Sequence, residues 1–201
     1  FAYSHGFSGG VSVALGDVTG DGRIDLITAA GYRGGPHIRI FDGATDFNTS
    51  RSFFAYDANY RGGVNLAVGD LDGDGVAEIV TGTGPGGGAH VRIFDGRTLA
   101  ATNAFFSGDT RDLSGTQVAV GDVDGNGLAD ITTWSQGRLR SFAGRNATPF
   151  VDLALATTAV IGGRAVSVGD LNGDGFAEIL LSDASGVTGY GGDPAGPSGF
   201  S

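Results

Sequence analysis

The sequence predicts an all-β protein of 201 residues, a β-propeller of four-stranded blades with four blades in the chain. Three observations predict this fold. An acidic motif returns four times at intervals of about 50 residues, and short segments of alternating apolar and polar residues flank each copy. The 39 glycines weigh against long helices, because glycine inside a helix costs about 1 kcal/mol. Repeats of this length with four strands each are typical of propeller blades.

The acidic motif sets the phase of the repeat. Its four copies read "GDVTGDGRID", "GDLDGDGVAE", "GDVDGNGLAD" and "GDLNGDGFAE". The leading aspartates, spaced by 53, 52 and 48 residues, are Asp17, Asp70, Asp122 and Asp170. In each motif, the nine residues from the leading aspartate to the final acid form a segment that we call an acidic loop. Acidic loops 1 to 4 are residues 17–25, 70–78, 122–130 and 170–178.

Four apolar segments in each repeat are expected to be strands, because their alternation has the period of two that a half-buried strand requires. The first strands precede the acidic loops, at 11–15, 64–68, 118–120 and 165–168. The second strands are expected at 24–28, 77–81, 129–133 and 177–181. The third strands are expected at 37–41, 90–94, 138–142 and 187–190. Phenylalanine-rich fourth strands are expected at 51–56, 102–106 and 149–155. Asp-Gly at 42–43 and 95–96 supplies hairpin turns between third and fourth strands.

The two ends of the chain predict how the propeller closes. "FAY" at 1–3 copies "FAY" at 54–56, which places a fourth strand at the start of the chain, whereas the last repeat stops after its third strand. We expect this N-terminal strand to complete the last blade. The chain is then one domain, 1–201, whose blades are about 6–56, 59–108, 113–155 and 160–201 plus 1–5. Closure within one chain gives four blades, and closure between two chains gives an eight-bladed homodimer; a slice of a longer array is the remaining alternative.

The acidic loops carry oxygen-bearing side chains at positions 1, 3, 5 and 9, counted from the leading aspartate. In loop order these are Asp17, Thr19, Asp21 and Asp25; Asp70, Asp72, Asp74 and Glu78; Asp122, Asp124, Asn126 and Asp130; and Asp170, Asn172, Asp174 and Glu178. Hard oxygen ligands in a flexible loop suit Ca²⁺, which takes about six to eight of them, better than Mg²⁺, which retains several waters. A backbone carbonyl at position 7 can add a ligand, from Arg23, Val76, Leu128 or Phe176.

The loops begin like an EF-hand but depart from it. Position 12 is threonine or leucine instead of the bidentate glutamate, and a strand follows instead of a helix. The pattern D-x-[DNT]-G-[DN]-G-x-x-[DE] between two strands of a 50-residue repeat resembles the FG-GAP (VCBS-type) repeat of integrin α-subunit propellers and many secreted bacterial proteins. The resemblance implies up to four bound Ca²⁺, one per blade. Loop 2, with four acids, is expected to bind most tightly, and the loops with Thr19, Asn126 and Asn172 more weakly.

Charge and composition limit the partners. The formal charge of −10 disfavours nucleic acid, and no apolar run approaches the roughly 20 residues of a membrane span. Thirteen of the 22 acids lie in the acidic loops, so four Ca²⁺ would bring the formal charge to −2. The resemblance implies an extracellular, cell-surface or periplasmic location.

A binding face is expected opposite the acidic loops, where chain reversal places the connections from second to third and from fourth to first strands. The sequence "YRGG" occurs twice there, with Tyr32, Arg33, Tyr60 and Arg61. Tyrosine and arginine are frequent interface anchors, so an unknown protein or glycan is the expected partner, with exposed turns of no binding role as the alternative. His37 and His90 begin equivalent third strands, where a structural hydrogen bond is expected and a metal-binding pair is the alternative.

These features predict a calcium-stabilised propeller that acts as a binding, adhesion or scaffold module and is not an enzyme. A carbohydrate-binding propeller is one alternative, although Trp134 is the single tryptophan where such lectins usually repeat one in each blade. A propeller-type hydrolase or lyase is less favoured, because the chain has no cysteine and its three histidines have no evident carboxylate partner in the sequence.

Overall fold

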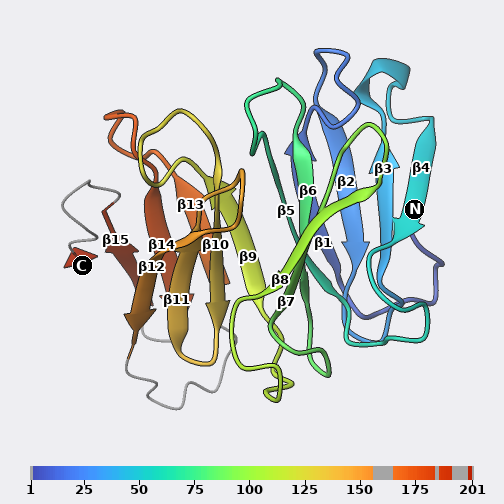
Figure 1. Ribbon diagram of the computed structural model, residues 1–201. Coiled ribbons are helices and arrows are strands. Elements are labelled where there is room, and N and C mark those ends of the chain that lie inside the picture. The colour runs from blue at the N-terminus through green and yellow to red at the C-terminus, as the bar shows by residue number, and fades with distance from the viewer. Residues whose placement is uncertain (1, 156–164, 184–185, 192–198, 201) are drawn as a thin grey trace.

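The computed structural model describes residues 2–155, 165–183, 186–191 and 199–200. In these residues four antiparallel sheets of four strands are arranged in a ring as the blades of a β-propeller (Figure 1). A short 3₁₀ helix, η1 (Gly43–Thr45), lies in the turn before β4. The predicted fold class and the count of four blades are therefore confirmed. No helix in the described part of the chain is long and apolar enough to cross a membrane.

Each blade contains four strands in chain order. Blade 1 consists of β1 (Val11–Gly16), β2 (Asp25–Ala30), β3 (His37–Phe41) and β4 (Ser50–Phe54). Blade 2 consists of β5 (Val64–Gly69), β6 (Glu78–Thr83), β7 (His90–Phe94) and β8 (Ala101–Phe106). Blade 3 consists of β9 (Gln117–Gly121), β10 (Asp130–Ser135), β11 (Arg138–Phe142) and β12 (Pro149–Ala154). Blade 4 consists of β13 (Ala165–Gly169), β14 (Glu178–Asp183), β15 (Gly186–Tyr190) and β16 (Gly199–Phe200).

The register of the first two strands is the same in every blade. The glycine that ends the first strand pairs with the acid that begins the second, as in Gly16 with Asp25 and Gly169 with Glu178. Each acidic loop is therefore a hairpin connection, with its position 9 inside the sheet. All four loops leave their blades from equivalent strand ends, which gathers them on one face of the propeller.

Apolar side chains fill the spaces between successive blades. Between blades 1 and 2, Val64 of β5 packs with Ile27 and Ile38. A second cluster joins blades 2 and 3, and a third joins blades 3 and 4. Trp134 belongs to this third cluster, so the single tryptophan is a core residue. The alternation predicted for the strands thus supplies the apolar surface that holds neighbouring blades together.

A tyrosine hydroxyl fastens the segment before blade 1 and the segment between blades 1 and 2 to the blade that follows. The Tyr56 hydroxyl donates to the carbonyls of Thr81 and His90 in blade 2, both at 3.0 Å. In the same way, the Tyr3 hydroxyl donates in blade 1 to the carbonyls of Thr28 at 3.1 Å and His37 at 2.8 Å. Tyr3 and Tyr56, the last residues of the two "FAY" segments, therefore make equivalent contacts, although no strand precedes Tyr3 in the described residues.

The prediction that the N-terminal strand completes blade 4 of the same chain is wrong for the described residues. The fourth strand of blade 4 is β16, near the C-terminus, and it pairs with Gly189 and Tyr190 of β15. Residues 2–10 form no strand and lie against blade 1, where Arg39 donates a hydrogen bond to the Ala2 carbonyl at 2.5 Å. Phe1, the first residue of the predicted strand, lies outside the described residues.

The first strand of blade 1 has an uncovered apolar face. Val13 and Leu15 of β1 are 63% and 65% exposed, and Val11 is 45% exposed. Val64, which takes the place of Val11 in blade 2, is only 2% exposed because blade 1 covers it. In the described part of the chain no strand of blade 4 packs on β1 as β1 packs on β5. The seam between blades 4 and 1 thus differs from the other three contacts.

This difference predicts unequal effects of one substitution at two equivalent positions. Val64→Ala should lower the free energy of unfolding by about 2 kcal/mol, since it removes two buried carbon groups. Val11→Ala should change it by less than about 0.5 kcal/mol, as is usual at an exposed site. Urea melts of both variants measure the effect. An equal loss for Val11→Ala would show that another blade covers β1 in solution, and light scattering would then show whether it comes from a second chain.

Candidate functional site

The carboxylate at position 9 is the buried centre of each acidic loop. Its four representatives are Asp25, Glu78, Asp130 and Glu178, which are 0 to 8% exposed. Oδ2 of Asp25 accepts hydrogen bonds from the backbone amides of Val18 and Thr19, both at 3.0 Å. Oε2 of Glu78 accepts one from the Leu71 amide at 2.8 Å. The side chain at position 9 therefore holds the beginning of its loop against the second strand.

The aspartate at position 1 shapes the rest of the loop. In loop 2, Oδ1 of Asp70 accepts from the Gly73 amide at 2.7 Å, and Oδ2 accepts from the Gly75 amide at 3.0 Å. Gly75 has φ +83°, a left-handed conformation that glycine adopts without strain. The glycines at position 6 of the other loops have the same sign of φ: Gly22, Gly127 and Gly175. The glycine predicted to permit a tight turn does so in all four loops.

Carboxylates converge in loops 2 and 3. In loop 2, Asp70, Asp72 and Glu78 offer oxygens that all lie within 4.8 Å of one another. In loop 3 the same arrangement is made by Asp122, Asp124 and Asp130. Loops 1 and 4 have Thr19 and Asn172 at position 3, so they lack the third carboxylate of this set. These two clusters, built from positions 1, 3 and 9, could each hold a metal ion.

The remaining predicted positions lie around these clusters. The side-chain oxygen at position 5 accepts from the amide of position 7 in every loop, in the pairs Asp21–Arg23, Asp74–Val76, Asn126–Leu128 and Asp174–Phe176. The second carboxylate oxygen of Asp74 also accepts from Arg97 at 3.0 Å. The structure therefore brings positions 1, 3 and 9 together and keeps position 5 engaged with the loop backbone.

The clusters carry an electrostatic cost. Burial, together with the neighbouring charges of Asp72, Asp70 and Asp74, raises the pKa of Glu78 to about 7, against the opposing effect of the Leu71 amide. Burial and the charge of Asp124 raise the pKa of Asp130 to about 6. Both carboxylates are therefore harder to ionise than ordinary acids. A bound cation would offset this cost, which makes the donor set a good fit for a divalent ion.

The acidic loops are also joined from blade to blade. The carbonyl of position 1 accepts a hydrogen bond from the amide of position 8 in the next blade, from Ala77 to Asp17 at 2.8 Å, for example. The same bond recurs from Ala129 to Asp70 and from Ala177 to Asp122. The conformation of one loop is thereby tied to the placement of the following blade.

Position 7 has a packing role that the sequence analysis missed. The side chains of Val76, Leu128 and Phe176 lie against a glycine at position 4 of the preceding loop, with no room for a further side chain there. Arg23 occupies position 7 in loop 1 and is exposed, because the described residues place no blade before it. Three of the four residues at position 7 are apolar, and this pattern in the sequence could have indicated a packing contact.

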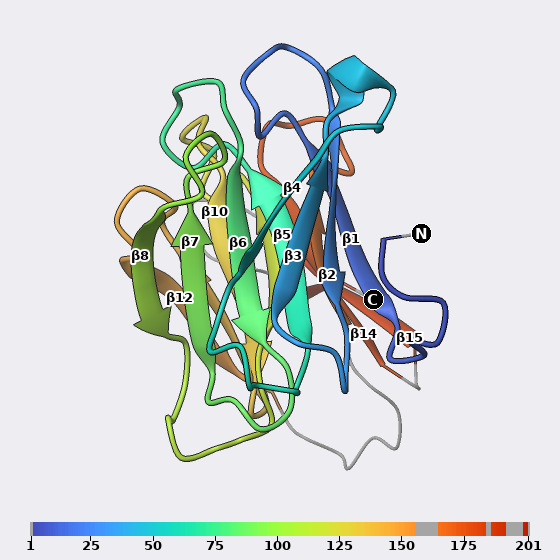
Figure 2. The same ribbon diagram turned by 90° about the vertical axis from the view of Figure 1, so that its right-hand side faces the viewer.

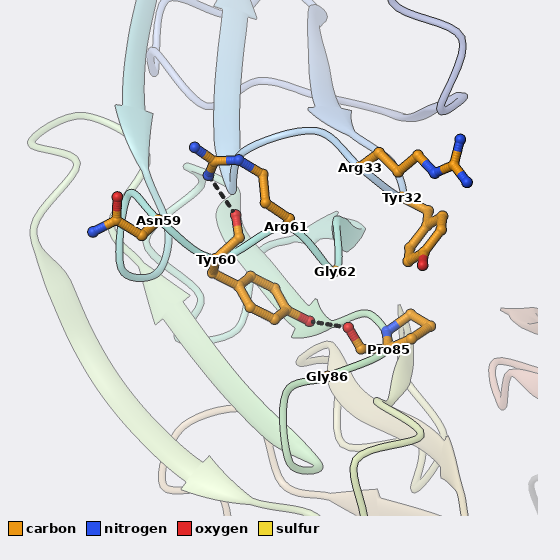
Figure 3. A pocket seen from close by; sticks show the side chains of 8 residues that line it. All are labelled: Tyr32, Arg33, Asn59, Tyr60, Arg61, Gly62, Pro85 and Gly86. Atoms are coloured by element: carbon orange, nitrogen blue, oxygen red, sulfur yellow. Dashed lines mark hydrogen bonds between the residues drawn. The ribbon is translucent and has the colours of Figure 1, made fainter.

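The four residues predicted on the opposite face come together in one pocket of about 370 Å³. Tyr32, Arg33, Tyr60 and Arg61 line it together with Asn59, Gly62, Pro85 and Gly86 (Figure 3). The connections that form it come from blades 1 and 2. Asn59 and Pro85 were not singled out from the sequence, because neither belongs to the repeated "YRGG".

Among the described residues, the rings of the two strand-initial histidines make aromatic contacts in place of the expected side-chain hydrogen bond. The His90 ring stacks on Phe106 with centroids 4.6 Å apart, and the His37 ring packs against Phe54 with centroids 5.1 Å apart. Burial, followed by the charge of a neighbouring arginine, lowers the pKa of both imidazoles. Both rings are therefore biased toward the neutral form within aromatic clusters.

The chain belongs to the FG-GAP-like repeat family, whose model matches residues 17–81 and 122–181. These two stretches contain the four acidic loops, whereas β1 and β9, which precede loops 1 and 3, lie outside them. Among curated proteins no match was found. The family assignment confirms the resemblance expected from the acidic motif.

Solved structures share the propeller fold. The chain is similar to rhamnogalacturonan lyase PL11 of Bacillus licheniformis, with 19% identity, a TM-score of 0.61, and coverage of 87% of this chain and 41% of that one. It is also similar to an Agrocybe aegerita lectin that recognises non-reducing terminal N-acetylglucosamine, with 20% identity, a TM-score of 0.56, and coverage of 93% and 50%. The chain thus spans half or less of these proteins, and identities this low show the fold alone.

The raised pKa of Glu78 predicts how the metal-free protein responds to pH. Because the folded-state pKa is about 7 and the ordinary value is 4.5, the stability associated with protonated Glu78 is present at low pH and is lost as the pH rises through 7. Urea melts after exhaustive removal of metal should give a lower midpoint at pH 7.5 than at pH 5.5.

The variant Glu78→Gln should flatten this dependence, since glutamine does not ionise and keeps an oxygen for the Leu71 amide. Asp109→Asn, an exposed acid outside the acidic loops, is the matched control and should keep the wild-type slope. An unchanged slope in Glu78→Gln would contradict the assignment of the effect to Glu78.

Proposed function

We propose that the protein is a calcium-stabilised, non-catalytic binding module, acting in adhesion or as a scaffold in an extracellular, cell-surface or periplasmic protein. The observation that carries the proposal is the convergence of three carboxylates in each of loops 2 and 3, in a motif that recurs in register in loops 1 and 4. The FG-GAP-like family assignment supports it.

Calcium suits this donor set better than other common ions. The clusters offer oxygen ligands alone, which disfavours metals that prefer nitrogen or sulfur. Positions 1, 3 and 9 would supply carboxylate or amide oxygens, while position 5 and the carbonyl of position 7 would complete a coordination number of about six to eight. The ion would supply positive charge and a fixed link between loop segments, with up to one ion in each blade.

A structural role for the ion follows from how the loops are connected. The hydrogen bonds from Ala77 to Asp17 and from Ala129 to Asp70 join neighbouring blades through residues at or beside the clusters. An ion that fixes a loop would therefore also fix the placement of the next blade. Extracellular modules typically bind Ca²⁺ with dissociation constants of about 10⁻⁴ to 10⁻³ M, which agrees with loops that carry threonine or asparagine ligands.

The proposal predicts stabilisation by calcium. Thermal melts in millimolar Ca²⁺ should give a higher Tm than melts in chelator, because an ion bound only by the folded state adds about 1.4 kcal/mol per site at ten times its dissociation constant. Mg²⁺ at the same concentration should have a smaller effect. Coincident melts in calcium and in chelator would refute calcium stabilisation.

The residue at position 3 predicts which loops bind calcium more tightly. Asp72→Asn gives loop 2 the position-3 residue of loop 4, and the asparagine oxygen can still accept from the Asp74 amide as Asp72 does. Its calcium affinity should fall by about tenfold in calorimetric titrations. Asn172→Asp in loop 4 is the reverse exchange and should strengthen binding there. No change in either titration would show that position 3 does not contribute a ligand.

A carbohydrate-binding propeller is the second candidate, favoured by the pocket of tyrosines and arginines on the face opposite the acidic loops. One of the similar structures is a lectin, and others are rhamnogalacturonan lyases. A lyase or hydrolase activity is the less favoured alternative, to be tested directly on polysaccharide substrates. Closure of the ring as an eight-bladed homodimer stays a prediction. Light scattering with and without calcium would test it by measuring how many chains form one particle.

A further inference from the structure

Arg33 has a left-handed backbone conformation, and the equivalent position of blade 2 is a glycine. The connection "GYRGGPH" in blade 1 aligns with "GPGGGAH" in blade 2, so that Arg33 corresponds to Gly86. Gly86 has φ +91° and Arg33 has φ +69°. A left-handed conformation costs a residue with a side chain roughly 1 kcal/mol or more. A non-glycine residue kept in it is a pointer to function.

The fold gains no evident stability from the Arg33 side chain. Its backbone amide donates to the Arg61 carbonyl at 2.9 Å, but a glycine amide would do the same. The guanidinium is exposed and makes no hydrogen bond or ion pair with another described residue. Its contact is with the ring of Tyr32, at 5.7 Å from the centroid. The strained backbone thus presents a guanidinium group whose donors are free for a ligand.

The pocket beside Arg33 is held in shape. The Tyr60 hydroxyl donates to the carbonyls of Gly84 at 2.5 Å and Pro85 at 3.2 Å, which fixes its ring. A side chain at Gly62 would collide with both the Tyr60 hydroxyl and the Pro85 carbonyl. In Figure 3, Tyr32 and Arg33 lie at the end of the pocket opposite Asn59, with Tyr60, Arg61 and Gly62 between them.

The charge of this pocket is opposite in sign to the net charge of the chain. Its lining contains two arginines and no acid, although the chain has a formal charge of −10. One nitrogen of Arg61 donates to the carbonyls of Ala58 and Tyr60, at 2.6 and 2.9 Å, so the guanidinium is anchored while its other donors remain available. The Tyr32 ring is 56% exposed.

We propose that this pocket binds an acidic polysaccharide through the carboxylate of a uronic acid unit, an inference that rests on the proposed function as a binding module. A guanidinium pairs with a carboxylate through two parallel hydrogen bonds, and arginine is well suited to this recognition. The exposed face of Tyr32 matches the apolar C–H face of a pyranose ring. Asn59 and the remaining arginine donors can bond the hydroxyl groups.

An open pocket with arginines at two places favours a polymer with repeated acidic units over a single small acid. The exposed Tyr32 ring provides rigid contact area with little loss of conformational freedom, and it suits the apolar C–H face of a pyranose ring. An acidic peptide is accordingly the competing outcome in the test.

The test is calorimetric titration with trigalacturonate at fixed free calcium, with its methyl-esterified counterpart as the neutral probe. Wild-type protein should bind the acid at least tenfold more tightly than the ester. Arg33→Gly should weaken binding at least tenfold. This variant restores the glycine of blade 2, so its Tm should equal or exceed that of the wild type, and lost binding cannot then be attributed to unfolding.

Arg111→Gln is the matched control, an exposed arginine on the same face that does not line the pocket; it should bind like the wild type. Equal affinity for acid and ester, unchanged binding by Arg33→Gly, or equal binding of a tri-glutamate peptide would overturn the proposal. Calcium melts of the same samples report separately on the proposed function, so that a calcium response without sugar binding would reject this inference alone.

Discussion

Each blade depends on a carboxylate buried where the second strand begins. A buried charge is costly unless hydrogen bonds or opposite charges compensate it. The backbone amides of the loop provide the hydrogen bonds, as Val18 and Thr19 do for Asp25. In loops 2 and 3 further carboxylates approach the same point, and burial together with these charges raises the pKa values of Glu78 and Asp130. This one arrangement gives the loop its shape and also creates its need for a cation.

The same loops contribute to the contacts between blades. The carbonyl of Asp17 bonds the amide of Ala77 in the next blade, and Val76 beside it packs on Gly20. Apolar clusters behind the loops, such as the one around Val64, complete each contact. Local loop structure and the stacking of blades are therefore coupled. A propeller needs this coupling because each blade contacts only its neighbours.

The two faces of the propeller carry different charged groups. Carboxylates gather on the face of the acidic loops, whereas the connections of blades 1 and 2 place Arg33 and Arg61 on the other. Figure 2 shows the connections extending from both ends of the strands of blade 2. Loops at the ends of a rigid sheet can vary without disturbing the core, which allows one blade to carry arginine where the next carries glycine.

The sequence by itself determined the repeat, its strands and the loop positions that converge. These features follow from local patterns, such as the Gly-Asp pairs at Gly16 and Asp17 and the alternation around Val64. Only the tertiary structure decided that β16 completes the last blade, that Val76 packs on a preceding loop, and that Tyr60 meets Pro85 across two blades. Such contacts join residues from about 10 to 60 positions apart. Their geometry depends on how whole strands and blades pack, which no local pattern specifies.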